Sequence, residues 1–465
     1  MRKSVALLTA LAACVIGAGC SRSGGSGTSQ KTSTAAAAAA ASTTTTATAG
    51  QCGSTPLQST DVGITTSTIT VEVMADVGSP LAPGLFQGSF DAMNAFAKYV
   101  NAHGGIGCRR LVVRTWDTKI DPTESKNGLI DACANALALV GNTVLFDPDV
   151  SPMTSCVDKS GASTGLPDIA ALTSDTAELC APTAYVIAGT FVQHCPLGSG
   201  AQPLTANIGE VRWFLKTFGP LHGLYLAASD TPTLAQTAAY LIAAQRTAGI
   251  TFDATPKVSG TDTQTAYTPR VQVAKQGGSN YVFNGSNDVA MIRMRKEALA
   301  QGLTSVKVWG CTLACYTQDM LSAGGAAVDG TYLTSSFLPF EEASYNAQDQ
   351  AYVSSVPTPS TWGAEAWQAG LAFKQVVDKI VATSGPNGIT RAAILDGLKN
   401  IGQFTADGWL GTTSLRDETP CFMVMQIQGG KFVRVYPTKP GTLDCDPAND
   451  VTVNVDMVAA GANLR

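Results

Sequence analysis

One serine and its flanking glycines have a spacing that is typical of catalysis. The run Gly161-Ala-Ser-Thr-Gly165 matches the pattern that places a nucleophilic serine on a sharp turn in hydrolases. That turn needs a strand leading directly into Ser163, whereas a Gly/Ser-rich loop surrounds it here. A hydrolase of this type also needs a histidine late in the chain, and the histidines are His103, His194 and His222. We therefore expect no enzyme activity.

A second spacing with possible chemistry is the pair Cys311 and Cys315, because closely spaced cysteines can bind a metal ion. Metal sites of this kind use two such pairs, and the sequence has no second pair to match Cys311 and Cys315. A glycine fingerprint for pyrophosphate binding is also absent. We expect neither a metal nor a cofactor, and we expect these two cysteines to close a small ring as a disulfide.

The first twenty residues indicate export. Arg2 and Lys3 precede an apolar stretch that runs through small residues into Cys20, which predicts a signal peptide over 1–20. The cysteine at the cleavage site makes the segment similar to a bacterial lipoprotein signal, whose cysteine is acylated and becomes the new N-terminus. Leu11-Ala12-Ala13-Cys14 also fits that pattern, so Cys14 or Cys20 is lipidated, and Cys20 leaves the longer apolar core. The alternative is an uncut anchor helix, but the apolar run is shorter than the ~20 residues that a span needs.

Residues 21–60 are predicted to form a low-complexity tether. The part over 21–50 consists mostly of Ser, Gly, Thr and Ala, with an alanine run over 35–41, and offers little apolar surface to bury. We expect a lipid anchor on the outer face of the cytoplasmic membrane of a bacterial cell envelope, followed by this tether and a folded body.

Length and composition indicate the number of domains, the partners and the disulfides of the folded body. The chain has 465 residues, of which 45% are hydrophobic and 14% charged, so two folded domains are expected. The net charge of −5 gives no reason to expect nucleic acid as a partner. The count of 12 cysteines leaves ten once Cys14 and Cys20 are set aside, and an even number in an exported chain predicts disulfides.

Strands and helices alternate along the folded body. This alternation predicts parallel sheets covered by helices on both faces, arranged as two Rossmann-like α/β lobes. The expected strands are 69–75, 111–115, 143–146, 168–172, 222–227, 251–258, 281–284 and 306–309, with a hairpin of 421–428 and 431–436. The expected helices are 88–102, 124–139, 205–218, 233–248, 267–276, 287–301, 362–383 and 390–399.

The predicted topology pairs some of the cysteines. Cys108 precedes the second strand and Cys133 lies late in the helix that returns antiparallel to it, so we predict a Cys108–Cys133 disulfide at one end of this unit. Cys421 and Cys445 flank the open side of the hairpin, and we predict that they pair. The partners of the other four stay open: Cys52, Cys156, Cys180 and Cys195.

The run from Ile69 to Leu111 carries a family resemblance. It reads ITVEVMADVGSPLAPGLFQGSFDAMNAFAKYVNAHGGIGCRRL. Its last part matches the pattern N-x-x-GGI-x-GR-x-L at Asn101, Gly104, Gly105, Ile106, Arg110 and Leu111. This resembles the opening of the type I periplasmic binding proteins, in particular the branched-chain amino-acid (Leu/Ile/Val-type) substrate-binding proteins of ABC importers. Segments 166–174, 267–285 and 330–334 resemble later parts of the family in the same order, so that the likeness covers most of 61–437.

The resemblance implies a two-lobed clamp with three hinge crossings, near residues 190, 335 and 419. Lobe I would comprise 61–190 plus 336–418, and lobe II 191–335 plus 419–465. In the family a small-molecule ligand is held where the carboxyl ends of the strands face the cleft, and the lobes close around it. A membrane ABC permease then receives the ligand, and we expect the binding protein itself to be a monomer.

The resemblance also directs attention to polar residues after the strands. Thr173 and Ser174 follow the fourth strand, where relatives bind a ligand carboxylate, although capping of the next helix is an alternative. Asp147 and Asp149 place charge where relatives usually have none, which indicates either a solvated turn or a cationic or polar ligand. Trp362 is a weaker candidate for the cavity wall. The predicted ligand-binding residues are Ser79, Asp149, Ser151, Thr173, Ser174, Thr231, Asn284, Ser286, Asp288 and Thr312.

The sequence as a whole predicts a lipid-anchored binding protein that captures a small polar, amino-acid-like molecule and delivers it to an ABC importer. A ligand-sensing or interaction lipoprotein on the same fold, without a transport role, is the alternative. The carboxylate with which amino-acid-binding relatives hold the ligand ammonium is absent at the matching position, near Ala290. The family's tyrosine after the first strand of the second lobe is also missing, so the ligand itself is left open.

Overall fold

A computed structural model describes residues 55–80, 83–189, 195 and 200–465. The predicted signal peptide, both candidate lipidation cysteines and most of the predicted tether lie outside these residues. The end of the predicted tether is bound to the folded body, because Asn387 Nδ2 donates to the carbonyl of Pro56 and Thr60 Oγ1 donates to the carbonyl of Ile389. The sequence predicted that the folded part begins at residue 61. Contacts with the folded body instead begin before that residue.

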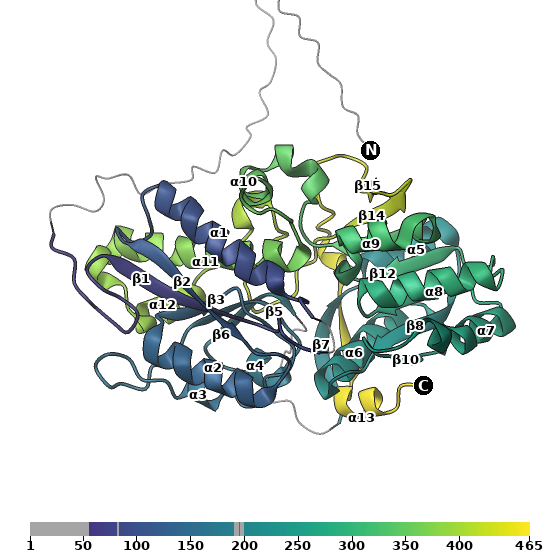
Figure 1. The fold of residues 1–465 in the computed structure, drawn as a ribbon, viewed down its shortest axis with the longest axis horizontal. Helices are drawn as coiled ribbons and strands as arrows, with labels where there is room; N and C mark the ends of the chain where they lie inside the picture. Colours follow the sequence, from purple (N-terminus) through teal and green to yellow (C-terminus); the bar gives the residue numbers. More distant parts are fainter. Residues whose placement is uncertain (1–54, 81–82, 190–194, 196–199) are drawn as a thin grey trace, which may run out of the picture. The chain divides into compact units, whose positions relative to one another are not determined.

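The first sheet is parallel and has, within the described residues, six strands in the order β2-β1-β3-β5-β4, with β6 paired to β5. These strands are β1 (Thr68–Ala75), β2 (Arg110–Asp117), β3 (Ala138–Val140), β4 (Thr143–Val144), β5 (Asp168–Thr173) and β6 (Ala184–Gly189). One face is covered by α1 (Gln87–Ala102), α10 (Ala347–Ser355), α11 (Thr361–Ser384) and α12 (Arg391–Lys399). The other face is covered by α2 (Pro122–Asn135), α3 (Ser151–Thr154) and α4 (Thr176–Leu179) (Figure 1). Two-sided burial explains the nearly continuous apolar runs of β3, β5 and β6.

The second sheet has the order β10-β8-β11-β12-β13-β14-β15, with β9 paired to β8. Its strands are β8 (His222–Ala228), β9 (Thr251–Ala254), β10 (Lys257–Val258), β11 (Tyr281–Gly285), β12 (Val308–Cys311), β13 (Thr331–Ser335), β14 (Met423–Gln428) and β15 (Lys431–Tyr436). All pairings are parallel except those of β14, which forms the predicted hairpin with β15. Helices α7 (Tyr267–Gly277), α8 (Asp288–Ala300) and α9 (Gln318–Gly324) cover one face, and α5 (Gly209–Phe218) and α6 (Pro232–Ala248) cover the other. The expected α/β class with parallel sheets is confirmed.

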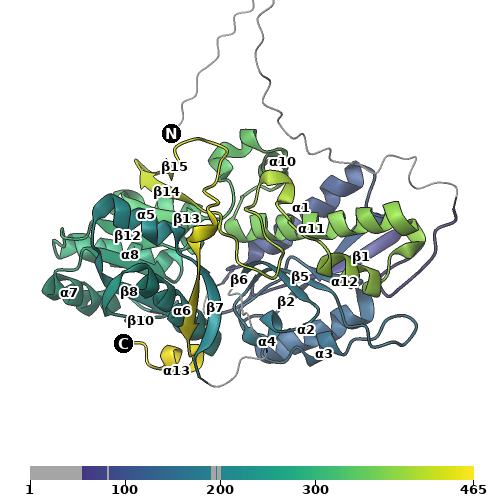
Figure 2. The same cartoon turned by 180° about the vertical axis from the view of Figure 1, so that it is seen from behind.

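A separate two-stranded sheet joins distant parts of the chain. β7 (Gln202–Asn207) pairs antiparallel with β16 (Asp450–Val455), and Figure 2 shows the two strands side by side. The short helix α13 (Met457–Ala462) follows β16, and its Met457 packs in the same cluster as residues of α6.

Two predicted helices were too long because each took in a strand. The helix predicted over 124–139 ends at Asn135, and β3 follows it with every residue buried. The helix predicted over 205–218 begins at Gly209, because 202–207 is β7. In β7 the buried residues Leu204 and Ala206 alternate with partly exposed ones, which is the period of a strand.

The disulfides correct one predicted pairing. Cys133 is bonded to Cys156, not to Cys108. The physical reason is that Cys108 packs against the cluster under α1 and α11, whereas Cys133 packs against the cluster under α2, on the opposite face of the sheet. The predicted Cys311–Cys315 and Cys421–Cys445 disulfides are present, and Cys180 is bonded to Cys195.

None of the helices in the described part of the chain combines the length and the apolar character that crossing a bilayer requires.

Candidate functional site

A cavity of about 440 Å³ lies where strand ends from both sheets meet. From the first sheet, Leu145 follows β4 and Ser174 follows β5. From the second sheet, Asp230 follows β8, Ser286 follows β11 and Thr312 follows β12. All of these residues lie beyond the carboxyl ends of parallel strands, which is where open α/β sheets hold their ligands.

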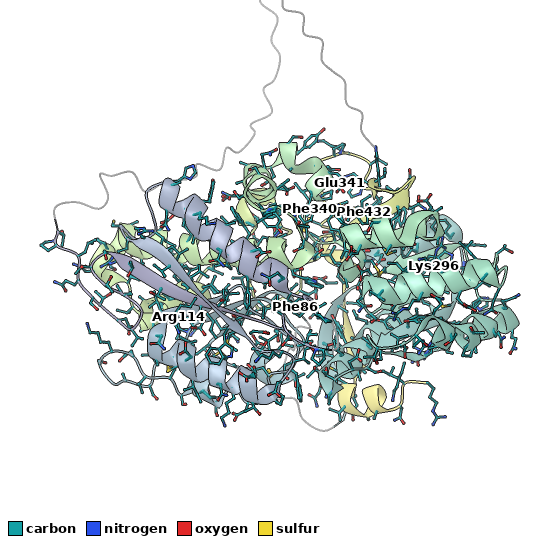
Figure 3. All side chains as sticks on the ribbon, viewed as in Figure 1. Phe86, Arg114, Lys296, Phe340, Glu341 and Phe432 are labelled. Atoms are coloured by element: carbon teal, nitrogen blue, oxygen red, sulfur yellow. A yellow bond between two sulfur atoms is a disulfide. The ribbon has the colours of Figure 1, made fainter. Side chains whose placement is uncertain are left out.

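Large apolar side chains form most of the cavity wall. Phe86 directly precedes α1 (Figure 3), and its ring meets the ring of Trp362 edge to face at 5.2 Å. Phe283 on β11 stacks on Tyr225 with ring centroids 5.5 Å apart. Apolar walls with few polar groups are typical of small-molecule sites.

A hydrogen bond closes one side of the cavity. Thr233 in the first turn of α6 donates from Oγ1 to the carbonyl oxygen of Leu145 at 2.6 Å. This bond connects a helix packed on the second sheet with the loop after β4 of the first sheet.

A disulfide ring forms another part of the wall. Thr312, Leu313 and Ala314 line the cavity, and the Cys311–Cys315 disulfide encloses all three. The ring is placed by buried Asn284, whose Nδ2 lies 3.2 Å from Sγ of Cys311 and donates to the carbonyl of Asn287 at 2.8 Å.

The ionisable groups of the wall are all acidic. Among the residues of the described chain that line the cavity, there is no lysine, arginine or histidine. The carboxylates on the wall are Glu210, Asp230, Glu365, Asp417 and Glu418.

Glu365 is the most deeply buried of these carboxylates. Its residue is 3% exposed, and within the described residues Oε2 has no hydrogen-bond partner. Burial raises the pKa of the Glu365 carboxyl well above its usual range. Glu365 follows Trp362 by three positions in α11, so both side chains lie on the same face of the helix.

Glu210 lies in the first turn of α5. Burial raises the pKa of its carboxyl to about 7, and the nearby Thr334 hydroxyl offsets part of that increase. Its Oε1 has no hydrogen-bond partner among the described residues.

Glu418 and Asp450 form a pair of like charges at the edge of the cavity. Burial raises the pKa of Glu418 to about 8, the charge of Asp450 adds to the increase, and the backbone amide of Thr419 opposes it. Burial raises the pKa of Asp450 to about 6.

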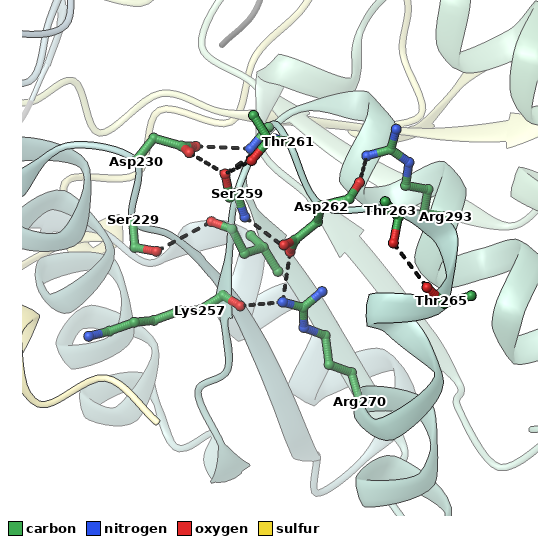
Figure 4. A network of polar contacts seen from close by, with 12 residues as sticks. Ser229, Asp230, Lys257, Ser259, Thr261, Asp262, Thr263, Thr265, Arg270 and Arg293 are labelled. Carbon is green, nitrogen blue, oxygen red and sulfur yellow. Dashed lines mark hydrogen bonds and ion pairs between the residues drawn. The ribbon is translucent and has the colours of Figure 1, made fainter.

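Asp230 differs from the buried glutamates because its carboxylate already accepts hydrogen bonds within the protein (Figure 4). It accepts from the hydroxyl of Ser259 and from the backbone amide of Gly260. Asp262 in the same loop accepts from Arg270 Nη2 at 2.7 Å. This network fixes the loop that presents Gly260 to the cavity, so we assign Asp230 to the structure of the wall. Asp417 is exposed and accepts from the hydroxyl of Ser414.

Three of the predicted ligand-binding residues line the cavity: Ser174, Ser286 and Thr312. The weaker candidate Trp362 also lines it. The Ser174 hydroxyl donates to the carbonyl of Leu145 at 3.4 Å, and Asp175, not Ser174, caps α4.

Other predicted residues are not among those that line the cavity. Thr173 donates to Oε2 of Glu178, and Thr231 caps α6 by accepting from the amide of Leu234. Asn284 is the anchor of the disulfide ring. Asp288 accepts from the hydroxyl of Thr317, and Ser79 is buried in the loop after β1.

The acidic turn after β4 does not supply charge to the cavity wall. Asp149 is exposed, forms an ion pair with Lys126 at 2.7 Å and accepts from the hydroxyl of Ser151. Asp147 is buried, its backbone amide donates to Asp175, and burial raises the pKa of its carboxyl to about 7. The solvated-turn interpretation fits Asp149 and Ser151.

Sequence reasoning missed the buried glutamates. One signal was available: Glu365 is the only charged residue in the run Thr361–Phe373, which reads TWGAEAWQAGLAF. A single carboxylate within an otherwise apolar helix indicates a functional or paired group. Glu210 gave no such signal, because its helix was predicted to start several residues too early.

Comparison with known proteins gives the same architecture. A family model described as "Periplasmic binding protein" matches residues 68–431. No curated protein matches the sequence.

Solved structures resemble this chain at low identity. An ABC transporter substrate-binding protein from Aeropyrum pernix has a TM-score of 0.64 and 11% identity, covering 86% of this chain and 100% of that one. A fatty acid ABC transporter substrate-binding protein from Thermomonospora curvata has a TM-score of 0.60 and 16% identity, covering 82% and 97%. A leucine-binding protein from Thermotoga maritima has a TM-score of 0.60 and 10% identity, covering 82% and 99%. At these identities the likeness shows a shared fold.

Proposed function

Because this chain belongs to the periplasmic binding protein family, we propose that it is an extracytoplasmic lipoprotein that captures a small molecule and delivers it to an ABC importer. The observation that carries the proposal is the cavity, which is lined by strand ends of both sheets. Ligand caught there contacts both halves of the fold at once.

The mechanism follows from that placement. We assign 61–190 plus 336–418 to one lobe and 191–335 plus 419–465 to the other, with crossings near 190, 335 and 419. Ligand that contacts both lobes stabilises the closed arrangement over the open one, because only the closed arrangement offers both sets of contacts. The permease then recognises the closed, loaded protein.

The lipid anchor belongs to the same proposal. Acylation of Cys20 would hold the protein at the membrane, and residues 21–54 would give it reach to the permease. Mass spectrometry of the mature N-terminus distinguishes Cys20 from Cys14, because the two cleavage products differ in sequence.

A thermal-shift screen of small metabolites on the full-length lipoprotein tests the binding step. A ligand at ~100 times its Kd stabilises the protein by about 2.7 kcal/mol. Trp362→Ala is expected to abolish the shift, and Asp149→Asn, which changes an exposed residue outside the cavity, is expected to keep it. Equal binding by Trp362→Ala and the unaltered protein would place the site elsewhere.

Uptake separates import from sensing. If the proposal holds, cells lacking the protein no longer accumulate the radiolabelled hit, and the unaltered gene restores uptake while the Trp362→Ala gene does not. Normal uptake in the deletion strain would overturn the delivery step and favour a ligand-sensing lipoprotein.

A further inference from the structure

The ionisable side chains on the cavity wall are acidic, and this indicates which class of ligand the proposed binding protein carries. The wall carries five carboxylates and, among the described lining residues, no basic side chain. In their ionised form, these carboxylates would repel a ligand carboxylate, which finds no cationic partner on the wall. A ligand cation would be attracted to them and would itself favour that ionised form.

Two of the carboxylates have oxygens without a partner. Oε2 of Glu365, on a residue that is 3% exposed, and Oε1 of Glu210 lack hydrogen bonds within the described part of the chain. Buried polar oxygens are costly unless they are paired, and such orphans mark places where a partner is missing. Both residues line the cavity, so a ligand can supply that partner.

The described wall offers fewer clustered ligating groups than a metal ion needs, and it suits an organic cation better. No group of three or more His, Cys, Asp or Glu side chains that could hold a metal is found among the described residues. An ammonium group instead needs only one or two carboxylate oxygens and offers up to three N–H donors.

The surroundings of Glu365 fit an ammonium on an apolar body. Trp362 lies one helical turn before Glu365, and both line the cavity. A cation beside them gains a charge-assisted hydrogen bond from the carboxylate and attraction to the indole face. Phe86, Leu145 and Phe283 then offer apolar surface to the rest of the molecule.

We infer that the ligand is a small organic amine, with an ammonium group held at Glu365 beside Trp362 and an aromatic or aliphatic body against the apolar wall. This inference rests on the proposed function, since it names the class of molecule that the cavity carries. It differs from an amino-acid-like ligand in requiring no carboxylate.

A matched set of probes tests this inference. 3-Phenylpropylamine, 3-phenylpropanol and 3-phenylpropionate share one apolar body and differ in charge. We expect isothermal titration of the full-length protein, above the pKa of its cavity carboxyls, to rank the amine first and the carboxylate last. Equal or tighter binding of 3-phenylpropionate would overturn the inference, and so would failure of the amine to bind.

An isosteric variant locates the preference. Glu365→Gln removes a charge and keeps the shape, and it is expected to weaken binding of the amine about tenfold, the worth of one charge-assisted hydrogen bond. Binding of the alcohol should be unchanged, which also shows that the variant is folded. Asp149→Asn is the matched control outside the cavity. An amine preference that survives in Glu365→Gln contradicts the inference.

The inference and the proposed function fail in different ways. If the metabolite screen yields a neutral or anionic ligand whose binding is lost in Trp362→Ala, the binding function holds and the amine class is wrong. If neither probes nor metabolites bind, both are wrong.

Discussion

Arg391 donates a hydrogen bond from Nη1 to Sγ of Cys156 at 2.9 Å, although the two residues are far apart in the sequence. Arg391 begins α12 and is fully buried. Its guanidinium also donates to the carbonyls of Cys133, Ala136 and Val157. One side chain thus ties α12 to both arms of the Cys133–Cys156 disulfide.

Arg391→Met is therefore expected to destabilise the protein by at least ~3 kcal/mol, because it leaves several buried carbonyls without a donor. Chemical denaturation with far-UV circular dichroism measures the loss. Arg110→Met, at an exposed position of β2, is the control and should change little. A loss below 1 kcal/mol, taken as about the worth of one ordinary hydrogen bond, would show that water replaces the arginine.

The cavity glutamates should make the free energy of unfolding depend on pH. Burial raises the pKa of Glu210 to about 7 and of Glu418 to about 8, from an ordinary value of 4.5. Between the ordinary and the raised value, the unfolded chain releases protons that the folded chain retains. The free energy of unfolding of the ligand-free protein should therefore fall as pH rises through this window and level off above it.

The glutamates can be isolated from the other buried acids by substitution. The double variant Glu210→Gln/Glu418→Gln should show a flatter fall than the unaltered protein, and Asp149→Asn should not, because the low pKa of Asp149 places its titration below the window. Parallel curves for the double variant and the unaltered protein would contradict the prediction. The titratable groups that face these two glutamates are Tyr225, Tyr281, Tyr240 and Asp450.

Asn284 should matter to binding through the disulfide ring. Asn284→Ala removes the donor to the carbonyls of Ser286 and Asn287 and the contact with Cys311. Because Ser286 and Thr312 line the cavity, we expect the affinity for a bound molecule to fall about tenfold, the worth of one buried hydrogen bond. Titration with 3-phenylpropanol, or with the best hit of the screen, measures the change.

The control for that prediction is Asn400→Ala, which removes a side chain that bonds only within the exposed end of α12. If Asn284→Ala binds as tightly as this control, the disulfide alone holds the ring in place.

Gly223 at the start of β8 is expected to tolerate no side chain. A Cβ there would lie 1.8 Å from the carbonyl oxygen of Tyr281 on the neighbouring strand, and the backbone φ is +159°. Gly278, with φ +62° and no atom within 4 Å of its Cβ position, makes a matched control. Gly223→Ala should lower the melting temperature far more than Gly278→Ala, whose cost is about 1 kcal/mol of left-handed strain. Similar melting temperatures would show that β8 and β11 separate easily.

The sequence predicted those elements whose signal is local. The segment from Ile69 to Thr115 was predicted to within about two residues, because its strand and helix periods are clear and glycines mark the turn. β7 was missed because its partner β16 lies at the other end of the chain, so that local apolar residues were assigned to the helix that follows. β3 was missed because the run over 136–140 is apolar throughout and continues the helix pattern.

The residues of the candidate site also fall into those with a local sequence signal and those that depend on packing between distant segments. Ser174, Ser286 and Thr312 were proposed because they follow strands, and the structure places them on the cavity wall, since strand ends meet at one edge of a parallel sheet. Their role in binding stays a prediction. Glu210 comes from the first turn of α5 and Glu365 from the second turn of α11, and only packing between distant segments brings these turns to the cavity. The error in Cys108–Cys133 has a related cause: sequence gives the end of an element, but it does not give the face of the sheet on which a side chain lies.

The pairing of β7 with β16 has a consequence for biogenesis. β7 is made before the middle of the chain, yet its partner emerges only near the end of translation. Until then the nascent polypeptide leaves Leu204 and Ala206 without the strand that completes their packing. A truncation before Asp450 would keep that apolar edge open to aggregation, whereas a chain threaded across the membrane before it folds can reach both strands together.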